Sequence, residues 1–212
     1  MRAPIRFYLD FASPYAWFAL DAVERLARER ERALEWRPIL VWAILKAVGA
    51  PPPMAVPARR DYILADIARS AAYYGVPYRP PARFPLSSHL AARAYHAIAA
   101  RDESRARAFG RQVFAAFFVD GEDISRDDVV RGIAARSGVR GDDADEAMNG
   151  PLGRARLAAA IEAAIADEVI GSPFFLVDGE RFFGADRVAQ LAWRLTGRPR
   201  PDLDPFAPAS PR

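Results

Sequence analysis

A serine hydroxyl at the start of a helix is the clearest candidate for chemistry in this chain. Residues 7–11 read Phe-Tyr-Leu-Asp-Phe, a short aromatic and aliphatic run that predicts a buried strand. Ser13 then takes the N-cap position of a predicted helix, and Pro14 fits the first turn, where its missing N–H costs nothing. The positive end of a helix dipole attracts anions, so the pattern predicts an anion site at this hydroxyl. On the residues alone, an ordinary helix cap is the simpler explanation of this serine.

Other chemistries are limited by what the sequence lacks. It contains no cysteine, which excludes disulfide exchange, a thiolate nucleophile and a cysteine metal site. His89 and His96 are the only two histidines, so we expect no metal site and assign both to the surface or to helix packing. A Ser-His-Asp triad is compatible with this count, but no nucleophile-elbow motif supports it.

The bulk composition indicates a globular protein that binds neither nucleic acid nor membrane. The 212 residues are 51% hydrophobic, enough for a full core in one or two domains. The formal net charge of +3 comes from interspersed acidic and basic residues, without a dense basic run. No stretch approaches the roughly 18 apolar residues of a membrane span, and we expect no leader before the first strand. We therefore expect a cytoplasmic location.

The first fifty residues read as strand, helix, strand. Apolar side chains at spacings of three and four predict a helix over residues 14–31. Residues 33–40 read as a second strand, and Pro38 indicates its end or an edge position. A proline tract at 51–53 then forbids helix and marks a break in the organisation of the chain.

A helical region and a hairpin complete the chain. The pattern is helical from about 57 to 168, and strand character returns at 173–177. Asp178-Gly179 is a strong hairpin signal, with 181–183 as the return strand. Gly184 to Asp186 then opens a last helix, with Asp186 as its N-cap.

This order predicts an α/β protein, a thioredoxin-like fold with an inserted all-helical domain. We expect the thioredoxin-like domain at residues 1–49 and 170–197. The inserted helical domain would span 50–169, and 198–212 would form a proline-rich C-terminal tail.

Several motifs, taken together in their order, resemble those of one known family. The run Phe-Tyr-Leu-Asp-Phe-Ala-Ser-Pro-Tyr-Ala-Trp at 7–17 is similar to the opening of 2-hydroxychromene-2-carboxylate isomerases. These enzymes are glutathione-dependent members of the DsbA-like thioredoxin superfamily and are close to kappa-class glutathione transferases. The resemblance continues through segments 37–49, 74–77, 120–125 and 171–187.

The resemblance implies a role for each matching position. Ser13 stands where thiol-disulfide relatives carry the attacking cysteine and would be the catalytic residue that faces the glutathione sulfur. Lys46, the only lysine in the chain, matches the lysine of the glutathione pocket. Ser172 and Pro173 match a cis-proline turn that pairs with the backbone of glutathione. The segment that holds the γ-glutamyl end corresponds to Phe183, Gly184, Ala185 and Asp186. The family further implies a small aromatic substrate and a homodimer.

Two readings compete with the isomerase. The chain departs from the usual family pattern at Ala50, Leu86-Ser87, Ser172 and Phe183-Gly-Ala, changes that bear on the second substrate more than on backbone contacts to glutathione. A kappa-like glutathione transferase or peroxidase would share the site and complete a different reaction. A non-catalytic DsbA-like module would use the same cleft to bind a peptide.

Overall fold

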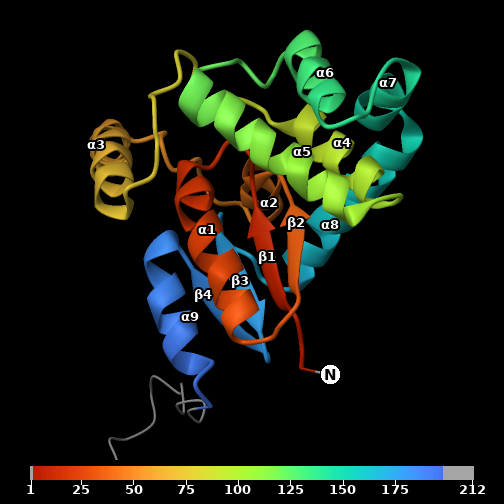
Figure 1. Cartoon of the computed structure of the whole chain (residues 1–212). Helices are drawn as coiled ribbons and strands as arrows, with labels where there is room; N and C mark the ends of the chain where they lie inside the picture. The colour runs from red at the N-terminus through yellow and green to blue at the C-terminus, as the bar shows by residue number, and fades with distance from the viewer. Residues whose placement is uncertain (1, 198–212) are drawn as a thin grey trace, which may run out of the picture.

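A four-stranded sheet lies at the centre of the computed structural model, which describes residues 2–197 (Figure 1). The strands are β1 (Ile5–Leu9), β2 (Leu34–Pro38), β3 (Phe174–Val177) and β4 (Glu180–Phe183). Their order is β2-β1-β3-β4, with β1 parallel to β2 and the other pairs antiparallel. This is the mixed sheet expected for a thioredoxin-like fold, so the predicted fold class is confirmed.

Nine α-helices and two short helical turns are found in the described part of the chain. They are α1 (Pro14–Glu29), α2 (Val41–Ala47), α3 (Pro57–Tyr74), α4 (His89–Ala99), α5 (Glu103–Ala115), the π-helical turn η1 (Ala116–Asp120), α6 (Asp127–Arg136), α7 (Asp142–Asn149), α8 (Pro151–Ala166), the 3₁₀ turn η2 (Ala185–Arg187) and α9 (Val188–Arg194). None of them is long and apolar enough to cross a membrane, within residues 2–197.

The alternation of side chains along β1 separates two layers of helices. Phe7 faces the core shared with α1 and α9, where its ring stacks on Phe175 of β3 with centroids 5.1 Å apart. Tyr8 faces the opposite side, in a cluster with Ile44 of α2 and Ala164 of α8. Both faces of the small sheet are therefore covered, which explains why β1 lacks the polar alternation of a half-exposed strand.

The helices α4 and α5 continue the core beyond the edge of the sheet. Trp36 of β2 stacks on Tyr95 of α4 with ring planes 5° apart. Gly110 permits the approach of α5, since a Cβ there would lie 2.9 Å from the Trp36 ring. The predicted boundaries between the thioredoxin-like domain and the helical insertion stay a prediction, and the proposed tail at 198–212 lies outside the described residues.

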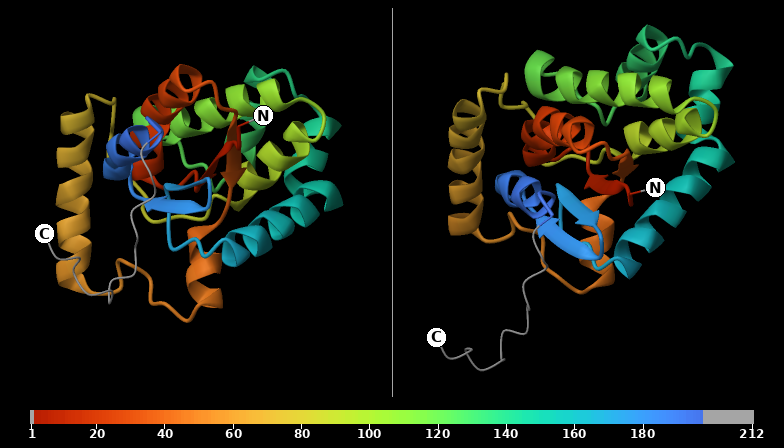
Figure 2. Two further views of the ribbon diagram at one scale, coloured as in Figure 1. Left: turned by 90° about the horizontal axis from the view of Figure 1, so that it is seen from below. Right: turned by 60° about the horizontal axis from the view of Figure 1, so that its bottom comes forward.

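Helix α3 stands apart from the other inserted helices, on the far side of α1 (Figure 2). It packs on α1 through Ile67 and Ala71, which bury Phe18 between them. The hydroxyl of Tyr15 in α1 also donates a hydrogen bond to Asp66 of α3, with an oxygen–oxygen distance of 2.6 Å. The insertion thus packs on α1 through α3.

Candidate functional site

Ser13 caps helix α1, as the sequence predicts. Its backbone is extended, with φ −94° and ψ 111°, and its Oγ accepts a hydrogen bond from the Ala16 N–H at 3.3 Å. Pro14 fills the first helical position. The hydroxyl also donates to the carbonyl of Ser172 at 2.8 Å. The structure therefore places this serine directly against the proline turn that the resemblance singles out.

The peptide bond between Ser172 and Pro173 is cis. The Ser172 hydroxyl accepts a hydrogen bond from the Asp10 N–H at 2.8 Å, and the Pro173 carbonyl accepts one from the Gly184 N–H at 3.0 Å. The turn is thus held on one side by the end of β1 and on the other by the residue that follows β4. A second cis bond joins Phe84 to Pro85, which the sequence analysis did not anticipate.

The segment 183–186 lies beside this turn. Phe183 is 47% exposed, and its ring rests on Gly171, where a Cβ would lie 2.5 Å from the ring. Gly184 has φ 111°, a conformation that side chains disfavour, and Ala185 is buried. The phenol of Tyr74, on α3, has its pKa raised by burial and then by the charge of Asp186. The charge of Asp186 is therefore felt at Tyr74 of α3.

One prediction about this segment is wrong. Asp186 is not the N-cap of the last helix, because α9 begins at Val188, its N-cap is Arg187, and no side chain caps it. Asp186 lies instead inside the 3₁₀ turn η2 and pairs with Arg187 at 3.1 Å. Its carboxylate remains exposed to solvent.

Lys46 lies in the last turn of α2 and is exposed. Within residues 2–197 its ammonium has no hydrogen bond or ion pair, and so none to the other predicted site residues. Its link to the site runs through its helix, whose first N–H, that of Val41, donates to Asp10 at 2.9 Å. The glutathione role of Lys46 stays a prediction.

Sequence analysis missed the residue at the centre of this arrangement, Asp10. Its carboxylate is buried, accepting hydrogen bonds from the Ala12 N–H, the Val41 N–H and the Ser88 hydroxyl. Burial raises the pKa of this carboxyl, and the bond from Ser88 opposes the rise most strongly. The sequence did offer a signal for Asp10, because it is an acid within an apolar run. An acid at such a position is rarely buried without hydrogen-bond partners.

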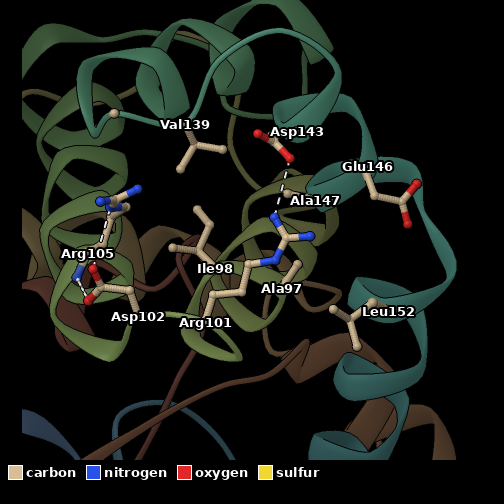
Figure 3. Close-up of a pocket in the computed structure, with 11 residues that line it drawn as sticks. Ala97, Ile98, Arg101, Asp102, Arg105, Val139, Asp143, Glu146, Ala147 and Leu152 are labelled. Carbon is tan, nitrogen blue, oxygen red and sulfur yellow. Dashed lines mark hydrogen bonds and ion pairs between the residues drawn. The ribbon is translucent and has the colours of Figure 1, made fainter.

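A pocket elsewhere in the molecule contains none of the predicted site residues (Figure 3). It lies between α4, the α6–α7 connection and the start of α8, where Ile98, Val139 and Leu152 line it and Arg101 points to Asp143. Its volume of about 90 Å³ is far below that of a typical small-molecule site. Within the described residues, no group of three or more His, Asp or Glu side chains is arranged to hold a metal ion.

Each histidine makes one hydrogen bond that the structure describes. The Nε2–H of His96 donates to the Pro38 carbonyl at 2.8 Å, which joins α4 to the end of β2. The Nδ1 of His89 lies 3.1 Å from the Ser87 hydroxyl. No bond of either ring reaches Ser13 in the described structure.

Comparison with known proteins places the chain in a family. Residues 4–196 match the DSBA-like thioredoxin domain. The chain is 32% identical over 190 residues to a 2-hydroxychromene-2-carboxylate isomerase from Sphingobium xenophagum, covering 89% of this chain and 95% of that protein. It is 26% identical over 204 residues to glutathione S-transferase kappa 1 of Rattus norvegicus, covering 90% of each.

A solved structure agrees with these sequence relationships. That of a 2-hydroxychromene-2-carboxylate isomerase superposes with a TM-score of 0.80 at 22% identity, over 91% of this chain and 94% of that one. The chain belongs to the 2-hydroxychromene-2-carboxylate isomerase family of DsbA-like thioredoxin proteins, to which kappa-class glutathione transferases are related.

Proposed function

We propose that this protein is a glutathione-dependent isomerase that converts 2-hydroxychromene-2-carboxylate to trans-o-hydroxybenzylidenepyruvate, or acts on a related aromatic catabolite. The observation that carries the proposal is the position of the Ser13 hydroxyl, which caps α1 and lies 2.8 Å from the carbonyl of the cis-proline turn. A thiolate bound here would meet both a hydroxyl donor and the positive end of a helix.

The residues around Ser13 fit the parts of glutathione. The turn at Ser172 and Pro173 offers backbone groups for the peptide, and the exposed carboxylate of Asp186 offers an acceptor for the γ-glutamyl ammonium. Lys46 would supply a positive charge for a carboxylate of the tripeptide. Glutathione, when bound, would supply a thiolate that adds reversibly to the conjugated double bond, so that the bond rotates before elimination restores it.

The role of Ser13 would be to donate a hydrogen bond to the glutathione sulfur. The Ser13 hydroxyl donates to the Ser172 carbonyl, so glutathione binding must exchange this neutral hydrogen bond for a charge-assisted one. Within residues 2–197 the Ser13 hydroxyl bonds to two backbone groups, the Ser172 carbonyl and the Ala16 N–H, and not to a side-chain base that would make this serine a nucleophile. We therefore assign it as a donor that lowers the pKa of the bound thiol.

A kappa-like glutathione transferase or peroxidase is the second candidate, because a kappa transferase matches along 90% of the chain. It would use the same residues for glutathione and differ in the fate of the sulfur. We also propose a cytoplasmic location, since the cytosol keeps glutathione reduced, and a homodimer, as the family resemblance implies.

Calorimetry with reduced glutathione tests the shared part of both candidates. We expect a dissociation constant between about 1 μM and 1 mM, the range of ordinary enzyme ligands. A matched control is Ser104→Ala, which removes a hydroxyl that donates to Asp102 at the start of α5. The absence of both heat and a thermal shift at millimolar glutathione would contradict every glutathione-based function for this chain.

A further inference from the structure

Asp10 is the residue on which the parts of the candidate site converge. Its main chain holds the two serines of the site, since its carbonyl accepts from the Ser13 N–H and its N–H donates to the Ser172 Oγ, both at 2.8 Å. Its carboxylate holds three further groups. The Oδ1 accepts from the Ala12 N–H at 2.9 Å and the Ser88 hydroxyl at 2.5 Å, and the Oδ2 accepts from the Val41 N–H at 2.9 Å.

These partners belong to the starts of three different helices. Ala12 immediately precedes the Ser13 cap of α1, Val41 is the first residue of α2, and Ser88 is the N-cap of α4. The Ser88 side chain makes no cap bond to its own helix and donates its hydrogen bond to Asp10 instead. Helix starts carry partial positive charge and unpaired N–H groups, so one buried carboxylate serves all three.

The cost of burying this carboxylate indicates that it does more than fill the core. Asp10 is only 6% exposed, and within residues 2–197 no arginine or lysine forms an ion pair with it. Burial raises its pKa, as expected for an acid whose charge is balanced by hydrogen bonds alone. An aliphatic side chain would pack at the end of β1 without that cost.

We infer that Asp10 is a positioning residue, which fixes the Ser13 hydroxyl against the Ser172 turn and ties α2 and α4 to that geometry. The inference deepens the proposed function and rests on it for its catalytic consequence, but its structural part stands independently. Asp10 is too enclosed to touch a substrate, so it acts through Ser13.

The variant Asp10→Asn tests this with little change of shape. An amide has one accepting oxygen, and the two carboxylate oxygens face different backbone donors, Ala12 N–H and Val41 N–H. Whichever way the amide turns, one of these donors loses its acceptor. Asp123→Asn is the matched control, because Asp123 also accepts from a backbone N–H and a hydroxyl, both of Ser125.

The first measurement is amide hydrogen exchange in the protein without glutathione. In Asp10→Asn we expect exchange at Ala12 or at Val41, whichever amide loses its acceptor, to be faster by about tenfold or more, with the interior amides of α1 unchanged. A general loss of stability would instead raise exchange throughout the core. Uniform acceleration, or no local change, would overturn the positioning role whether or not glutathione binds.

The second measurement is the pKa of the glutathione thiol in the complex, by thiolate absorbance. We expect Asp10→Asn to raise that pKa and lower kcat about tenfold, as losing the support of a site residue does, with KM for glutathione little changed. In a Ser13→Ala background the same substitution should produce no further shift. If Asp10 acted only through its charge, removing that charge would lower the thiol pKa. A lowered pKa would therefore contradict the inference, and so would a shift of equal size in the Ser13→Ala background.

The two measurements separate this inference from the proposed function. Locally faster exchange at Ala12 or Val41, without any glutathione binding, would support the structural role of Asp10 and contradict the proposed function. Normal binding with an unshifted thiol pKa in Asp10→Asn would sink the inference and leave the function standing. Ser88→Ala removes one hydroxyl that donates to Asp10 and should disturb the exchange pattern. Ser88→Thr keeps a hydroxyl donor at this position and should leave the pattern as in the parent protein.

Discussion

Replacing Ser13 by alanine removes a hydroxyl that has two partners in the free protein. The cap bond from the Ala16 N–H is long, at 3.3 Å, and the bond to the Ser172 carbonyl is 2.8 Å. Losing a helix cap costs about 1 kcal/mol, and an unpaired carbonyl adds about as much. A domain of this size is stable by about 5–15 kcal/mol, so the variant should still fold.

The effect on a bound thiol follows from the exchange of hydrogen bonds. A bond to a charged acceptor contributes about 1.5–3 kcal/mol, against about 0.5–1.5 kcal/mol for the neutral bond to Ser172 that it replaces. The difference of about 1–1.5 kcal/mol corresponds to about one pKa unit. The glutathione thiol should therefore titrate about one unit higher in Ser13→Ala than in the parent. Activity should fall about a hundredfold, as it does when one anion-stabilising donor is removed.

The assay is a pH titration of the ultraviolet thiolate absorbance of bound glutathione. Ser13→Thr keeps a hydroxyl at the same position and should retain most of the pKa depression. Ser104→Ala should behave like the parent, because its hydroxyl bonds to Asp102, away from the site. If Ser13→Ala keeps the parental thiolate fraction at neutral pH, the serine is only a helix cap and the reasoning is refuted.

Three further predictions concern neighbouring parts of the molecule. Burial lowers the pKa of His96 below its ordinary 6.5, so the unfolded chain binds a proton first as the pH falls. Thermal stability should therefore drop as the pH decreases from about 7 through the folded pKa, and His96→Gln should flatten that slope in denaturation scans. Gly171→Ala puts a methyl group 2.5 Å from the Phe183 ring. It should weaken glutathione binding in calorimetry. In a protein that already carries Phe183→Ala, the clash is absent, so Gly171→Ala should cause no further weakening. Lys46→Ala should weaken binding by roughly 1 kcal/mol, about fivefold, at low salt and by less at high salt, whereas an unchanged dissociation constant would place this lysine outside the site.

The parts of the fold that sequence predicts are those set by neighbouring residues. The aromatic run before Ser13 and the serine-proline pair fix strand and helix locally, and Asp178-Gly179 forms the expected hairpin with φ of 51° and 79°. Both residues of that turn need left-handed backbone, which Asp and Gly tolerate. The cis bond before Pro173 came from the family resemblance alone.

The parts that sequence did not predict depend on contacts between distant segments. Ser88 meets Asp10 across 78 positions of chain, and neither residue type announces such a bond. Asp186 carries a capping side chain and yet the helix starts beyond it, since Gly184 pairs with Pro173 and directs the chain into a 3₁₀ turn. Gly110 was not singled out from the sequence, yet a side chain there would collide with the Trp36 ring, which lies 74 positions earlier in the chain but packs against α5.

The most direct test of the account follows 2-hydroxychromene-2-carboxylate by ultraviolet absorbance with trace glutathione, while free thiol is titrated in parallel. An isomerase returns glutathione unchanged in each turnover, so we expect many turnovers per glutathione and a constant thiol concentration. Ser13→Ala should slow that turnover about a hundredfold. Thiol lost in proportion to product would identify a transferase, and an untouched substrate in the presence of bound glutathione would contradict the proposed reaction.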